Sequence, residues 1–133
     1  MRKADWPWLA LQDSLTLEQA AKHPSVTAAV KRWSACMGKA GHTYPAPEAA
    51  IADSRWDLDE PAVSEEEKQV ATADTACKWS SGLVAAWYAA DAELQRAVVR
   101  DNPERFTALR VNLRQRFERA SRLLAEHEGR KVG

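Results

Sequence analysis

The sequence lacks most of the patterns that specific chemistry requires. It contains no glycine-rich phosphate-binding loop, no two cysteines two residues apart, no paired histidines of a zinc-binding helix and no nucleophile elbow. These absences exclude the familiar motifs for nucleotide, metal and acyl-transfer chemistry. We therefore assign no catalytic residue and no metal ligand, and we expect no cofactor.

Long apolar runs are also missing. No stretch of eighteen apolar residues occurs, so we expect no membrane span. Met1, Arg2 and Lys3 carry the charge of a signal-peptide start, but Asp5 and Pro7 leave no apolar core after them, so no export signal is expected.

Charge of one sign is not in excess, since nineteen basic side chains balance nineteen acidic ones. Such balance argues against a nucleic-acid partner. The last part of the chain departs from it, because residues 102–133 hold eight basic and four acidic side chains. We favour a solvated outer helix face over a binding surface as the reason.

What the chain does contain is helical periodicity. Residues 64–101 carry two adjacent apolar stripes when placed at about 100° per residue, which is typical of a helix buried on two sides. Ser64 stands three residues before Glu67, the spacing of a capping box that begins a helix. The length of 133 residues suits one domain, so we predict a single all-α helical bundle, 1–133, with a long central helix at 64–101.

Shorter elements are expected before the central helix. Residues 1–13 are predicted to form an arm over the bundle, with Trp6 and Trp8 either packed inward or held for a membrane surface or partner. Thr16 is expected to cap a short helix that ends near His23, and Pro24 then begins a helix that stops at Gly41.

Two further segments complete the predicted bundle. Residues 42–63 form a proline-containing connector with a short helix at 48–54, whose Ala50 and Ile51 are inward candidates. Asn102 and Pro103 begin the last helix, whose apolar stripe runs from Phe106 to His127. Because the link is so short, we predict that the last two helices form an antiparallel C-terminal hairpin.

Two carboxylates lie beside apolar positions of the central helix. Asp74 and Asp91 fall near Tyr88 on the helical wheel, so one or both are expected to be partly buried. The structural interpretation pairs Asp74 with Lys78, or Asp91 with an arginine of the last helix. The functional interpretation is a pocket, and its predicted lining is Asp74, Tyr88, Asp91, Trp87 and Trp56.

Several short patterns are similar to those of small secreted or lipid-anchored actinobacterial proteins. They are Trp33-Ser34-Ala35-Cys36-Met37, then Gly41, Tyr44 and Pro47, then residues 73–78, Gly82-Leu83 and Trp87. The resemblance covers roughly residues 26–125 and implies a location outside the cytoplasm and one cystine. It implies no activity.

Cys36 and Cys77 are the only cysteines, and each falls on the inward stripe of its own predicted helix. Two packed antiparallel helices can bring such residues within disulfide distance, so we predict a Cys36–Cys77 bond. The alternative is a pair of buried thiols, the default in a reducing cytosol. The location is accordingly extracellular or cell-envelope if the bond forms and cytoplasmic if it does not.

Three functions remain open at this stage. The first is an extracytoplasmic binding or interaction module that holds a small-molecule ligand or protein partner on an aromatic surface near Trp6, Trp8, Trp56 or Trp87. The second is a small enzyme or accessory protein that uses Asp74 or Asp91 as general acid or base, with Tyr88 assisting. The third is a purely structural part of a larger envelope assembly.

Overall fold

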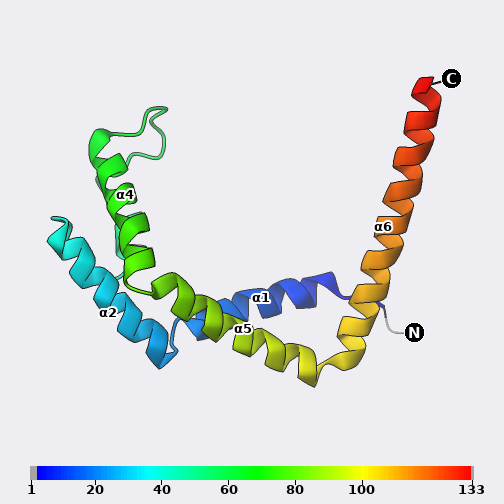
Figure 1. The fold of residues 1–133 in the computed structure, drawn as a ribbon, viewed down its shortest axis with the longest axis horizontal. Coiled ribbons are helices and arrows are strands. Elements are labelled where there is room, and N and C mark those ends of the chain that lie inside the picture. Colours follow the sequence, from blue (N-terminus) through cyan, green and yellow to red (C-terminus); the bar gives the residue numbers. More distant parts are fainter. Residues whose placement is uncertain (1–2, 133) are drawn as a thin grey trace. The chain divides into compact units, whose positions relative to one another are not determined.

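The computed structural model describes residues 3–132, and every regular element in them is a helix (Figure 1). The predicted all-α class is therefore confirmed. The helices are α1 (Trp6–Ala20), α2 (Pro24–Lys39), α3 (Pro47–Ile51), α4 (Glu65–Ser80), α5 (Leu83–Asp101) and α6 (Pro103–Val132).

The chain forms two compact units. One comprises residues 16–94, and the other comprises residues 1–15 together with residues 95–133. Helices α1 and α5 each supply residues to both units. We call the first the core unit and the second the terminal unit.

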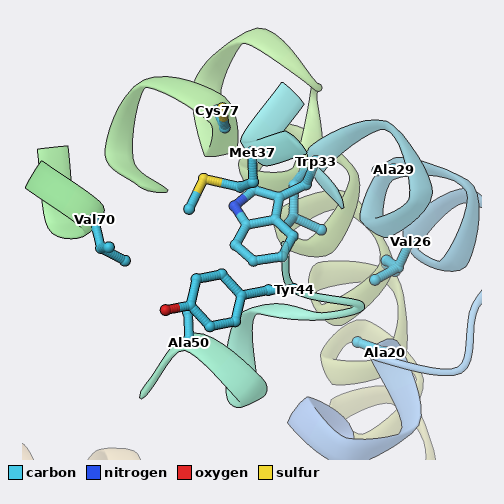
Figure 2. Close-up of a cluster of buried hydrophobic side chains, with 11 residues drawn as sticks. Ala20, Val26, Ala29, Trp33, Met37, Tyr44, Ala50, Val70 and Cys77 are labelled. Atoms are coloured by element: carbon cyan, nitrogen blue, oxygen red, sulfur yellow. The ribbon is translucent and has the colours of Figure 1, made fainter. Parts of the chain in front are cut away.

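The core unit is a helical bundle around fully buried side chains of α2. Trp33, Met37 and Val26 are its largest fully buried residues, and they lie among Ala29, Tyr44, Val70 and Cys77 (Figure 2). The buried residues of α2, Val26, Ala29, Trp33 and Met37, recur at three- and four-residue steps, which turns one face of the helix inward. Helix α2 lies beside α4 (Figure 1).

Local chemistry sets the ends of α2 as predicted. Pro24 occupies the first turn, where a missing amide proton costs nothing, and the His23 ring accepts a hydrogen bond from the backbone N–H of Ser25. At the other end Gly41 has a φ of 90°, in the left-handed region that favours glycine. The predicted short helix of the connector is α3, which buries Ala50 but leaves Ile51 exposed, so the inward placement of Ile51 was wrong.

The predicted single central helix is wrong in one respect, because it is two helices. Ser64 begins α4 as expected, its Oγ accepting a hydrogen bond from the backbone N–H of Glu67 at 3.1 Å. The helix then ends at Ser80, and Gly82 has a φ of 77°, which interrupts the ladder before α5 starts. Arg32 Nε donates to the carbonyl oxygen of Ser81 at 2.9 Å and so satisfies a group that the break leaves unpaired.

In the terminal unit, the start of α1 packs on the start of α6. Trp6 Nε1 donates to Asn112 Oδ1 at 2.9 Å, and the Trp8 ring meets the Phe106 ring edge-on at 5.7 Å. Residues 6–13 of the predicted arm are thus the first part of α1, and Thr16 is a buried residue inside α1 instead of its cap. The contact of Trp8 with Phe106 holds this end of α1 against α6.

Helix α6 begins at Pro103 as predicted, and one residue, Asn102, separates it from the end of α5. Its stripe is buried only near the start, where Ala108 and Leu109 are covered. From residue 113 to residue 131, nineteen in a row, every side chain is exposed. The periodicity predicted an apolar face correctly, but the described part of the chain does not cover its second half.

Candidate functional site

A disulfide joins α2 and α4 in the core unit. Cys36 and Cys77 are bonded, with their Cα atoms 5.7 Å apart, as predicted from their places on facing stripes. Cys77 is buried and Cys36 is partly exposed. The bond closes a sequence separation of 41 residues, so it holds the connector between two fixed ends.

Asp74 has the structural pairing that the sequence suggested. Its Oδ2 accepts from Lys78 Nζ at 2.8 Å, and its Oδ1 accepts from Trp33 Nε1 at 3.0 Å. The first partner was predicted from the spacing of one helical turn, whereas the second depends on how α2 and α4 pack. Since both oxygens already accept hydrogen bonds, Asp74 is poorly placed to exchange a proton with a substrate.

The other predicted pocket residues differ in how far they are buried. Tyr88 is 75% exposed, because the break at Gly82 changes the phase between α4 and α5. Trp56 is partly buried and donates its Nε1 hydrogen bond to the carbonyl oxygen of Ala50 at 2.8 Å. Trp87 and Asp91 are partly buried on α5, Trp87 against the edge of the core. A pocket shared by these residues stays a prediction.

A charged network in the connector was not predicted from the sequence. The buried Tyr44 donates its hydroxyl hydrogen bond to Asp53 Oδ2 at 2.5 Å, and Arg55 Nη2 donates to that same oxygen at 2.8 Å. Arg55 Nη1 also pairs with Glu66 in the first turn of α4. The network therefore ties the connector to the start of α4.

The network shifts the pKa of its members. Hydrogen bonds from Arg55 and Tyr44 hold the pKa of the Asp53 carboxyl well below its usual range. Burial, followed by the hydrogen bond to Asp53, raises the pKa of the Tyr44 hydroxyl above its ordinary value. Tyr44 therefore stays protonated at neutral pH and acts as a donor that fixes the loop.

An open cleft of about 480 Å³ lies between the end of α2 and one face of α4. Its lining is Ala40, His42, Glu65, Lys68, Gln69, Thr72, Ala73 and Ala76. None of the predicted pocket residues is among them. Within residues 3–132 no three metal-ligating side chains come together, there or elsewhere. The cleft offers charges of both signs and no hydrogen-bonded acid–base pair.

Several large apolar side chains lie on the exposed part of α6. Leu113, Phe117 and Leu124 are 58%, 72% and 63% exposed, although such side chains are normally covered. Together with Ala120 they form the surface that we call the α6 stripe. Among the described residues, no hydrogen bond, ion pair or ring contact joins α6 beyond Arg116 to another helix.

The tryptophans near the start of the stripe, Trp6 and Trp8, pack within the terminal unit. Trp6 and Trp8 are partly buried against α6, and the guanidinium groups of Arg116 and Arg105 lie 5.1 Å and 4.5 Å from their ring centroids. This contact accounts for both rings by packing within the terminal unit. The α6 stripe is therefore our candidate interaction surface, and binding through Trp56 or Trp87 stays a prediction.

Comparison with known proteins gives no functional lead, since no family model, no curated protein and no solved structure matches the chain. No helix among the described residues combines the length and apolar character needed to cross a membrane. The candidate site thus depends on the geometry of α6 alone. The sequence analysis had noted the basic excess of residues 102–133 but interpreted it as a solvated helix face.

Proposed function

We propose that the protein is an extracytoplasmic interaction module that binds its partner through the α6 stripe. The observation that carries the proposal is the run of nineteen exposed helical residues, 113–131, with large apolar side chains along one line. In proteins most helical stability comes from the packing of an amphipathic face against a neighbour and not from intrinsic propensity. A partner that covers the stripe would supply that packing.

The location outside the cytoplasm is part of the proposal. The Cys36–Cys77 disulfide supports it, because such bonds persist mainly in oxidising compartments. The likeness of residues 26–125 to secreted or lipid-anchored actinobacterial proteins supports it as well. The enzyme alternative gains nothing from Asp74, whose two oxygens are engaged by Trp33 and Lys78.

Site-specific photo-crosslinking in cells that produce the protein tests the proposal. A benzophenone amino acid replaces Phe117 in one variant and Arg122 in a matched variant, because residue 122 points about 140° away from residue 117 on the same helix. We expect adducts, whether to protein or to lipid, from position 117 and far fewer from position 122. Absence of adducts at position 117, or equal yields at both positions, would contradict the interaction role.

A further inference from the structure

Most of the charged side chains that border the α6 stripe are basic. Taking the direction of Leu113 as the axis and about 100° per residue, Phe117 and Leu124 lie within about 40° of it. Between residues 110 and 131 the charged side chains within about 100° of this axis are five basic ones and one acidic one: Arg110, Arg114, Arg116, Arg130, Lys131 and Glu128. The other two carboxylates of that segment, on Glu118 and Glu126, lie about 140° away. The apolar stripe is therefore bordered mainly by positive charge.

The exposed segment as a whole is also positively charged. Residues 113–131 hold six basic and three acidic side chains, a net charge of +3. A second copy of α6 would place like charges beside Arg110, Arg114 and Arg116, which is destabilising. The charge distribution fits a partner that is anionic and disfavours self-association through this face.

The extent of the stripe argues against a helical protein partner. A coiled-coil seam through Leu113, Phe117, Ala120 and Leu124 continues to Arg110 at one end and to His127 and Lys131 at the other. Its apolar part thus spans fewer than two heptads, whereas a stable coiled coil sustains the pattern over about three or more. The apolar positions of the stripe also carry no hydrogen-bonding group that would select one protein partner.

We propose that the α6 stripe binds the anionic headgroup layer of a lipid membrane, with the helix lying along the surface. This inference rests on the interaction role of α6 and names the partner. The apolar side chains enter the boundary between headgroups and acyl chains, while the arginine stems extend to the lipid phosphates. Every residue from 113 to 131 is exposed, and within this segment only Arg116 contacts α1, so most of the stripe is open to a flat surface within the terminal unit.

Flotation of the full chain with lipid vesicles tests the proposal. One vesicle set is phosphatidylcholine alone, and the other contains about one third phosphatidylglycerol, so that surface charge is the main difference. We expect the chain to bind the anionic vesicles about tenfold more tightly than the neutral ones, and the preference to fall as salt is raised.

Two pairs of matched variants separate the apolar and the charge contributions. Phe117→Ser should weaken binding about tenfold, whereas Gln115→Ser, the same new residue on the opposite face, should change it less than about twofold. Replacing both Arg110 and Arg114 with glutamine should weaken binding to anionic vesicles about tenfold or more. Replacing both Arg119 and Arg122 with glutamine should weaken binding clearly less. All these side chains are exposed, so circular dichroism and the melting temperature serve as folding controls.

Equal binding to both vesicle types, no binding to anionic vesicles, or undiminished binding by Phe117→Ser would each overturn the membrane assignment. So would a dimer in solution that the Phe117→Ser change dissolves. If vesicles are not bound but the crosslinker at position 117 captures a protein, the membrane assignment is wrong and the interaction role stands. If neither vesicles nor crosslinking gives a signal, both proposals fall.

Discussion

Asp53 is the residue whose charge the connector depends on most. It accepts hydrogen bonds from the buried Tyr44 and from Arg55, and Arg55 reaches on to Glu66 of α4. No periodicity or spacing marks these residues, because the contacts arise only when the connector folds back on α4. Asp74 shows the same limit, since its bond to Lys78 follows from sequence spacing but its bond to Trp33 follows from the packing of two helices.

Asp53→Asn should lower the melting temperature at neutral pH. The folded-state pKa of Asp53 is depressed, so its stabilising effect is present above the ordinary carboxyl pKa of about 4 and is lost as the pH falls toward the lower folded value. The difference in melting temperature between wild type and variant should therefore shrink steadily below about pH 4. Thermal unfolding followed by circular dichroism across this range checks it.

Asp59→Asn is the matched control, because Asp59 lies exposed in the same connector. It should leave the melting temperature nearly unchanged at every pH. A difference for Asp53→Asn that persists unchanged at low pH would mean that shape, and not charge, is what the connector loses.

At the scale of elements, the ends of helices were the most predictable features. Pro24, Ser64 and Pro103 act through their own backbone or side-chain chemistry, so the helix starts that they set can be predicted from the sequence. The break between α4 and α5 was missed because the apolar pattern continues across it. A glycine inside such a pattern can either continue the helix or end it in a left-handed conformation. The observed φ of Gly82 shows that it ends the helix.

Gly82→Ala should destabilise the protein by about 1–2 kcal/mol, because an L side chain is strained in the left-handed region. Space is not the cause, since an added Cβ would meet Arg32 Nη2 at an ordinary 3.7 Å. Gly38→Ala is the matched control, as it lies in α2 with open space around it, and alanine there should stabilise by up to about 1 kcal/mol. Urea unfolding of both variants measures the two effects, and a neutral Gly82→Ala would contradict the strained turn.

The disulfide between α2 and α4 should dominate the stability of the core unit. For a separation of 41 residues the chain-entropy account gives about 4 kcal/mol. Cys36→Ala and Cys77→Ala should each lose about this amount, and the double variant should lose no more than either single one.

Reduction of the wild type provides the check. It should lower the melting temperature to that of the double variant, and reductant should leave the double variant unaffected. Losses that add in the double variant would indicate that the two side chains contribute independently.

At the scale of the whole molecule, the net charge is zero but the two units carry opposite net charges. Residues 16–94 hold twelve acidic and seven basic side chains, and the rest of the chain holds seven acidic and twelve basic ones. The sequence showed the basic excess near its end and the apolar stripe within it. It did not show that the stripe is left uncovered, because periodicity identifies an apolar face but not what packs on it.

Hydrogen–deuterium exchange of the purified full chain tests most directly whether the α6 stripe is uncovered, because it reports the protection of each backbone amide. If α6 has no partner within the molecule, the amides of residues 113–131 should exchange about a hundredfold or more faster than those of α2 and α4, which share the buried core. Protection of residues 113–131 equal to that of α2, in a protein shown to be monomeric, would mean that the stripe is already covered and would contradict the interaction surface.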